Sequence, residues 1–204
     1  GKDCQPTNDV TEKTAPEGQV KIIIEKDKRL LTIYEDGKPY KEFPVAIGKS
    51  STPSPVGEWK VINKSMHWGT GFGTRWIGLN VPWGIYGIHG TNKPWSIGQA
   101  ASKGCFRMYN KHVEELFSWI KVGTPVLVVG DPYTSYRRLL KNGSVGQDVV
   151  LVQQKLRTEK ILWLPADGRF GAATERALKL YQMLYGLPPT GQVDKAMWEH
   201  MINQ

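Results

Sequence analysis

The chain has 204 residues, a formal net charge of +8, two cysteines and eight tryptophans. This length allows one large domain or two small ones with a real core, whereas two cysteines are too few for a disulfide scaffold. No apolar run approaches the roughly 18 residues that a membrane span needs. The 27 lysines and arginines are scattered and form no basic stripe, so the charge does not indicate a nucleic-acid binder.

Residues 1–18 are polar, contain two prolines and show no hydrophobic period. We therefore expect a flexible tail over 1–18, in which Cys4 has no particular role. Because the sequence begins with Gly1, a signal peptide or an anchor would already be missing from it, and its absence says nothing about location.

From Val20 the hydrophobic pattern has a period of two, which predicts a β-rich domain over residues 19–131. Asp36-Gly37 between two β-rich runs is typical of a tight hairpin. Apolar spacing over 110–121 predicts one late helix, with Asn110 as its N-cap. The predicted strands cover residues 20–25, 30–35, 41–47, 57–63, 76–80, 85–88 and 125–129.

After Asp131-Pro132 the apolar spacing becomes helical, and we place a small all-α domain over residues 137–204. Helices are expected after Gly146 and Gly171, with a last short one around Met197. The segment at 167–174 is weakly repeated at 190–197, each with a turn glycine before an apolar anchor. The predicted fold is thus a β-rich domain, mostly β with one late helix, followed by a small all-α domain.

Reactive residue types concentrate between His89 and Arg107. His89 follows an apolar strand, sixteen residues before Cys105. The intervening loop could therefore place the imidazole beside the thiol, where the imidazole could act as the base. Gly104 lets the backbone bend close to a substrate, so that nearby amides can face a developing oxyanion. Positive charge on Lys103 and Arg107 favours a thiolate, and Arg107 could also hold a carboxylate.

An arbitrary cysteine and histidine at this separation would more often be a core thiol and a structural loop histidine. The combination of His-Gly-Thr at 89–91 with Ser-Lys-Gly-Cys-Phe-Arg at 102–107 is far more specific than that pair. With the segments at 52–59, 72–79 and 85–88, it resembles the catalytic domain of the L,D-transpeptidases, the YkuD-type family, over residues 19–131.

The resemblance implies a cysteine-nucleophile enzyme that remodels bacterial peptidoglycan. His89 would take the proton of Cys105, and the thiolate would attack the third residue of a tetrapeptide stem. D-Alanine would leave, and an amine of another stem would form the cross-link. Attack by water instead would make the protein an L,D-carboxypeptidase. Backbone amides around Gly104 and Cys105 would stabilise the oxyanion.

The family orients its histidine through a neighbouring backbone or hydroxyl group, and here Ser102 and the carbonyls of the loop after His89 are both candidates. Many members have His where this chain has Lys103, so position 103 is assigned no acid–base role. The expected catalytic set is Cys105, His89, Gly104, Ser102 and Arg107. Substrate-binding residues are not assigned.

The all-α domain resembles the common helical peptidoglycan-binding module. Most matching positions are turn glycines and core apolar residues, which support the fold better than a ligand contact. The alternative is an appendage that only stabilises the chain. The matches include Gly146, Val149, Leu156, Gly168, Phe170, Gly171, Ala177, Gln182 and Gly191.

The four histidines are dispersed, and no H-E-x-x-H or C-x-x-C motif is present, so we expect no metal and no cofactor. His67 is interpreted as a surface-loop residue, and His112 and His200 as solvated. Glu114 and Glu115 are adjacent on a helix and point in different directions, which argues against a two-carboxylate glycosidase.

The expected partner is peptidoglycan with its muropeptide stems, and we expect no nucleic acid, no membrane span and a monomer. The family implies an extracytoplasmic protein, secreted or associated with the cell wall, with a role in wall biogenesis and cell shape. A net positive charge fits work among anionic wall polymers. The alternative is a wall-binding protein without a working active site, which would bind sacculi but release no D-alanine.

Overall fold

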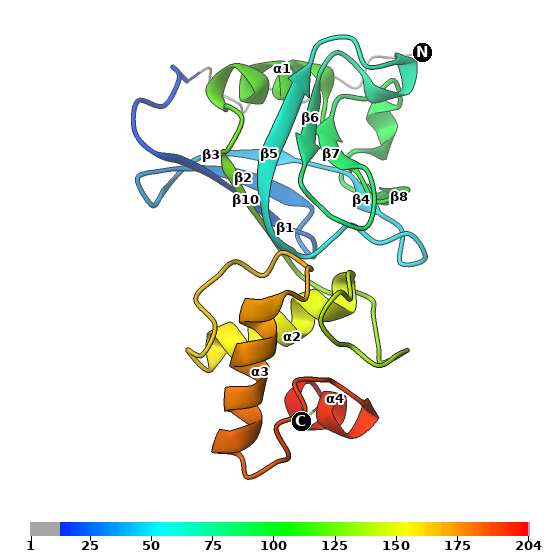
Figure 1. Ribbon diagram of the computed structural model, residues 1–204. Coiled ribbons are helices and arrows are strands. Elements are labelled where there is room, and N and C mark those ends of the chain that lie inside the picture. Colours follow the sequence, from blue (N-terminus) through cyan, green and yellow to red (C-terminus); the bar gives the residue numbers. More distant parts are fainter. Residues whose placement is uncertain (1–12, 204) are drawn as a thin grey trace. The chain divides into compact units, whose positions relative to one another are not determined.

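The computed structural model describes residues 13–203 (Figure 1). These residues form two compact units. One comprises the chain up to Ser54 with Trp59–Asn80 and Tyr86–Asp131, and the other comprises Pro55–Glu58, Val81–Ile85 and the chain from Pro132 onward. No helix among the described residues is long and apolar enough to cross a membrane.

The first unit is built on a curled, eight-stranded sheet, as the period-two pattern predicts. Its strand order is β3-β2-β1-β10-β5-β6-β7-β9. The sheet strands are β1 (Val20–Glu25), β2 (Leu30–Glu35), β3 (Lys38–Pro44), β5 (Gly57–Ser65), β6 (Trp76–Leu79), β7 (Tyr86–His89), β9 (Phe106–Arg107) and β10 (Pro125–Val129).

Alternate residues of neighbouring strands point inward and form the core of this unit. Ile22 and Ile24 of β1 are fully buried beside their β10 partners Val126 and Val128. β-Branched side chains pack well on a pleated surface, and burying each one stabilises the fold by about 1.5–3 kcal/mol.

The hairpin at Asp36-Gly37 is confirmed. Both residues have positive φ, 48° and 80°, as a two-residue turn of the primed type requires. The return strand differs from the prediction, because it begins at Lys38 and ends at Pro44. Residues 13–19 are bonded to this hairpin; for example, Gln19 donates its backbone N–H to Asp36 Oδ1 over 2.9 Å. The remainder of the predicted tail, including Cys4, lies outside the described residues.

The helix α1 (Asn110–Trp119) is shorter than predicted, and its expected cap is wrong. Tyr109 is the N-cap and has no side-chain bond to the helix, because the side chain of Asn110 contacts two loops instead. His112 was also expected to be solvated, but it is 3% exposed. The helix turns this face toward Phe43, which buries the imidazole.

Several short elements escaped the sequence analysis because they have two or three residues each, too few to show a period. Strands β4 (Ile47–Gly48) and β8 (Ala100–Ser102) pair in parallel as a separate two-stranded sheet. Two short 3₁₀ helices are η1 (Thr70–Phe72) and η2 (Pro94–Ser96). η2 and β8 lie between His89 and Arg107, and β4 is attached to that segment through its pairing with β8.

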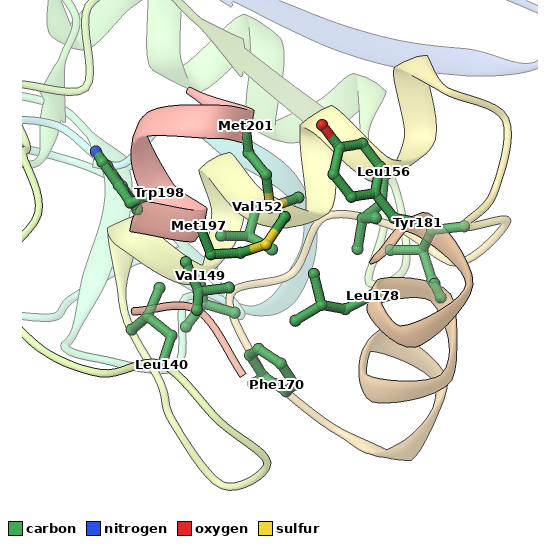
Figure 2. Packing of buried hydrophobic residues seen from close by; sticks show 13 residues of the cluster. Leu140, Val149, Val152, Leu156, Phe170, Leu178, Tyr181, Met197, Trp198 and Met201 are labelled. Atoms are coloured by element: carbon green, nitrogen blue, oxygen red, sulfur yellow. The ribbon is translucent and has the colours of Figure 1, made fainter. Parts of the chain in front are cut away.

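The second unit contains the three expected helices, α2 (Gln147–Thr158), α3 (Ala172–Leu184) and α4 (Lys195–Met201). Their apolar faces meet in one cluster, in which Val149, Leu178 and Trp198 are at most 1% exposed (Figure 2). The β-rich domain is thus followed by a small all-α region, as the sequence predicts. His200 was expected to be solvated and is half-buried, with its Nδ1 2.9 Å from the hydroxyl of Tyr181.

The weak repeat of this unit corresponds to two equivalent turns, each held by a buried glutamine. Gln153 Oε1 accepts the N–H of Gly168 over 2.9 Å, and Gln182 Oε1 accepts the N–H of Gly191 over 2.9 Å. Both glycines have positive φ, 79° and 68°, which explains why glycine recurs there. The repeat therefore records a structural device of the fold rather than a ligand motif.

Candidate functional site

The two reactive residues of the motif come from neighbouring strands. β7 ends at His89 and pairs in parallel with β9, where His89 is the register partner of Arg107. Continuing the register backwards puts Cys105 beside Gly87, and a backbone hydrogen bond from Gly87 lowers the pKa of the Cys105 thiol. His89 and Cys105 are thus two positions apart on adjacent strands, the spacing at which side chains share a face of a sheet.

A tight turn presents Cys105, and Gly104 is the residue that allows it. Gly104 has φ +120°, and a Cβ there would lie 2.7 Å from Cε1 of the Tyr86 ring. Cβ atoms do not approach other atoms so closely, and side-chain-bearing residues rarely adopt this φ. Any other residue at position 104 would displace the turn, and with it the sulfur.

Ser102 holds the same turn from inside. Its side chain is 1% exposed, its Oγ–H donates to the carbonyl of Cys105 over 2.6 Å, and its Oγ accepts the N–H of Gly104 over 3.1 Å. Thr52 Oγ1–H donates to the carbonyl of Ser102 over 3.0 Å. Ser102 therefore holds the turn at Cys105, whereas the ring of His89 is bonded to the carbonyl of Gly90.

This arrangement changes the expectation for the oxyanion donors. The sequence suggested amides around Gly104 and Cys105, but the Gly104 N–H already points at Ser102 Oγ. A donor that is engaged in the resting fold cannot also face an oxyanion without breaking that bond. The N–H of Cys105 is the candidate that remains of the two.

His89 is buried among aromatic rings and bonded to its own loop. It is 4% exposed and stacks on Trp76, with ring centroids 5.7 Å apart and an interplanar angle of 18°. The edge of Phe72 meets it at 5.0 Å. Its Nδ1 bonds the carbonyl of Gly90; a carbonyl only accepts, so Nδ1 carries the proton and Nε2 keeps a free lone pair.

Both reactive groups are neutral in this environment. Burial lowers the pKa of His89 to about 4; the bond to Gly90 opposes that shift, and the charge of Arg107 adds to it. Burial raises the pKa of Cys105, while the Gly87 amide and the Arg107 charge lower it. A thiol beside a neutral imidazole is suited to proton transfer at the moment of attack rather than to a standing ion pair.

Arg107 is fixed through its backbone and lies half-buried. It exchanges two backbone hydrogen bonds with Ala46, at 2.8 and 3.0 Å, and its Nη1 donates to Ser96 Oγ over 3.4 Å. It acts on both His89 and Cys105 through its charge. Its expected influence on the thiol is therefore present, whereas a carboxylate contact stays a prediction.

The sequence analysis missed the aromatic surroundings of His89. Trp68, which is 43% exposed, stacks on Trp76 with ring centroids 3.9 Å apart, and both contact Phe72. These residues come from the glycine-rich stretch and the strand after it, where no reactive residue type draws attention. The eight tryptophans of the sequence were the one indication of such an aromatic cluster.

The other candidates lie apart from this chemistry. His67 and Lys103 are exposed, and among the described residues no group of three His, Cys, Asp or Glu side chains could hold a metal ion. Glu115 pairs with the buried Lys41. Cys105 is a free thiol within the described part of the chain.

The second unit has a hollow of its own. A cavity of about 210 Å³ lies between the end of α3 and α4, with Leu187, Pro188, Met197 and His200 among its lining residues. Its polar groups are engaged by the fold; for example, Asp194 caps α4 through the N–H of Met197 over 2.8 Å. The cavity alone does not identify a ligand.

Two family models match the chain. The model described as "L,D-transpeptidase catalytic domain", named YkuD, matches residues 19–128. The model described as "Putative peptidoglycan binding domain" matches residues 145–201. The first match covers the sheet and all five residues of the expected catalytic set, and the second covers the helical unit.

The chain is similar to curated proteins of Bacillus subtilis that carry the same family name. It is 43% identical to "Putative L,D-transpeptidase YkuD" over 107 residues, which make up 52% of this chain and 64% of that protein. It is 36% identical to "Putative L,D-transpeptidase YqjB" over 129 residues, 56% of this chain and 73% of that protein. The chain thus spans less than two thirds of the first relative.

Solved structures of L,D-transpeptidases are also similar to the first unit. The catalytic domain of the E. faecium enzyme is 28% identical with a TM-score of 0.48, covering 54% of this chain and 97% of that one. The Mycobacterium smegmatis enzyme is 20% identical with a TM-score of 0.47, covering 55% and 59%. On the strength of the two sequence matches to its β-rich half, the chain belongs to the L,D-transpeptidase family of the YkuD type.

Proposed function

We propose that this protein is a cysteine-dependent L,D-transpeptidase that joins stem peptides of bacterial peptidoglycan. The observation that supports this most directly is the tautomer of His89. With Nδ1 bonded to Gly90, the free Nε2 is the atom left to take the proton of a thiol on the adjacent strand. A base and a nucleophile on one sheet face, with the base oriented by a third group, is the general arrangement of covalent acyl transfer.

In the first half-reaction the thiol proton of Cys105 moves to Nε2 of His89 while sulfur attacks the carbonyl carbon of the third stem residue. The carbonyl π bond becomes an oxyanion, for which the Cys105 N–H is the proposed donor. The oxyanion collapses, the bond to the fourth residue breaks, and the imidazolium returns its proton to the departing amine. The products are D-alanine and a thioester on Cys105.

In the second half-reaction an amine of another stem attacks the thioester carbon. His89 accepts a proton from that amine and returns one to sulfur as the carbon–sulfur bond breaks. The result is an amide cross-link and the free thiol. Water in place of the amine gives hydrolysis, which is the L,D-carboxypeptidase reaction on the same residues.

We also propose that the helical unit holds the enzyme on its polymeric substrate. The family match of residues 145–201 supports peptidoglycan as the ligand. Work on this polymer places the protein outside the cytoplasm. Tethering raises the effective concentration of the stems at the site without any new catalytic contact.

The test is incubation with a defined disaccharide-tetrapeptide, followed by mass spectrometry of the products. Transpeptidation gives a cross-linked dimer and D-alanine, hydrolysis gives a tripeptide and D-alanine, and a wall-binding protein gives neither although it sediments with sacculi. Intact mass after incubation with a carbapenem should show a covalent adduct that Cys105→Ala cannot form. An adduct on Cys105→Ala would refute the assignment of the nucleophile.

A further inference from the structure

The side chain of Asn110 connects two loops of the site rather than capping its helix. Its Oδ1 accepts the backbone N–H of Thr91 over 3.0 Å and that of Thr74 over 3.2 Å. Thr91 follows His89 by two residues, and Thr74 precedes β6, whose Trp76 stacks on the imidazole. The Oδ1 of Asn110, at the start of α1, thus bonds both the loop that follows His89 and the loop that precedes β6.

The bond to Thr91 reaches His89 through a single peptide group. The N–H of Thr91 and the carbonyl of Gly90 are opposite ends of the same planar unit. That carbonyl accepts the Nδ1–H of His89. Asn110 therefore fixes the plane that orients the imidazole, and hydrogen bonds in such a chain polarise one another. If the plane rotates, the carbonyl turns away from Nδ1.

The backbone around Asn110 leaves room for its carboxamide only because two neighbouring residues are glycines. A Cβ at Gly90 or at Gly73 would overlap Oδ1 of Asn110. Gly73 also has φ +60°, and a Cβ there would overlap the peptide between Gly90 and Thr91 as well. Two glycines from separate loops thus leave the space that this one side chain fills, which a simple surface contact would not require.

We propose that Asn110 is a positioning residue for His89, acting through the Gly90–Thr91 peptide to hold the imidazole in the orientation and tautomer that the base requires. This inference rests on the proposed role of His89. The hydrogen bonds of Asn110 go to the backbone N–H groups of Thr74 and Thr91. Its effect should therefore fall on kcat and leave KM unchanged, since misplacing a reacting group by about 1 Å can cost up to 100-fold in rate.

The groups that act on His89 define what a titration will report. Trp76 and Phe72 supply apolar burial, Gly90 supplies the carbonyl, and the charge that bears on the ring is Arg107. Cys105 is the titratable neighbour on the β9 side. Asn110 is neutral, so replacing it by another neutral residue weakens its hydrogen bonds without changing the charge around the ring, whereas Asp adds a negative charge.

The test compares Asn110→Leu, which removes the acceptor at nearly constant volume, with Asn110→Asp, which keeps an acceptor and adds charge. We expect Asn110→Leu to slow the reaction with a carbapenem about 10- to 100-fold and to lower the pKa of His89, measured from its ring ¹⁵N shifts by NMR. We expect Asn110→Asp to retain a rate within about threefold of wild type and to raise that pKa.

The control is Asn80→Leu, which also removes an asparagine acceptor of a backbone N–H, that of Lys60 at 2.8 Å, but at an exposed place. It should lower thermal stability less than Asn110→Leu does and leave both readouts of His89 unchanged. If Asn110→Leu and Asn80→Leu lose only stability, Asn110 is merely a structural contact and the inference is wrong. If Asn110→Leu does not fold, the absence of any shift in Asn110→Asp refutes it equally.

The NMR readout needs no turnover, so this inference and the proposed function can fail separately. A protein that forms no thioester but whose His89 responds to position 110 would retain the positioning role and lose the enzymatic one. If the protein cross-links stems but the pKa of His89 does not change with substitutions at position 110, the proposed function stands and the positioning role of Asn110 is wrong.

Discussion

His89 and Arg107 are register partners in the parallel strand pair β7–β9, so a guanidinium charge lies on the strand beside His89, two residues after Cys105. The charge lowers the pKa of both His89 and Cys105. For the imidazole this adds to the effect of burial, and for the thiol it opposes burial. Burial is the main cause of the lowered pKa of His89, and the Arg107 charge adds to it while making the Cys105 sulfur easier to ionise.

The first prediction concerns the pH dependence of the free thiol. Because burial raises the pKa of Cys105, alkylation by iodoacetamide should accelerate steadily between about pH 6 and pH 9 and show no plateau below the usual thiol range. Arg107→Gln should raise the thiol pKa further and slow alkylation at about pH 8 by threefold to tenfold. Lys103→Gln removes an exposed charge nearby and is the control. A rate that is flat from about pH 6 upward would mean a resting thiolate and contradict this description.

The second prediction separates backbone strain from steric clash at the nucleophile turn. Gly104 and Gly98 both have positive φ, 120° and 86°, but only a Cβ at Gly104 meets another group, the ring of Tyr86. Gly98→Ala should cost about 1–3 kcal/mol of unfolding free energy from strain and keep most activity. Gly104→Ala should cost more and abolish acylation of Cys105. Equal losses in denaturant melts and in acylation would show that the close approach to Tyr86 is unimportant.

The third prediction concerns the brace under the turn. Ser102→Ala leaves the Gly104 N–H and the Cys105 carbonyl without their partner, and each such buried loss costs about 1–3 kcal/mol. We expect a lower melting temperature and slower acylation. Ser118→Ala removes an exposed serine bond, Oγ to the carbonyl of Glu115 at 2.7 Å, and should change neither. Full activity in Ser102→Ala at a reduced melting temperature would limit Ser102 to stability.

The sequence could predict what depends on local pattern. The long strands, the Asp36-Gly37 turn and the three helices of the second unit follow from periodicity and turn chemistry. The choice of His89 and Cys105 rests on residue type, because few side chains can act as base and nucleophile, and it stays a prediction. The strands β4, β8 and β9 could not be predicted, since pairing between segments of two or three residues depends on the rest of the sheet.

The surroundings of the site were harder to predict for the same reason. Asn110 beside a helix start is a common cap in sequence terms, and only the folded chain shows its oxygen reaching two loops. His112 is a polar residue type and was therefore expected in solvent, but it packs on Phe43 because α1 turns that face inward. Contacts between residues that are distant in the chain decided each of these outcomes.

The fourth prediction uses the repeated turns of the helical unit. Gln153 and Gln182 are each 2% exposed, and each accepts the N–H of a turn glycine. Replacing either by Leu leaves that N–H buried without an acceptor, at about 1–3 kcal/mol. Hydrogen exchange should therefore accelerate at Gly168 in Gln153→Leu and at Gly191 in Gln182→Leu.

Each variant is the control for the other, because the two turns have the same construction at separate places. If each glutamine stabilises its own turn, exchange at the second glycine should change less than exchange at the first. Equal acceleration of both glycines in either variant would mean that the unit opens only as a whole. In that case both turns would open with the same free energy. The glutamines would then contribute to the global unfolding free energy rather than to the local order of each turn.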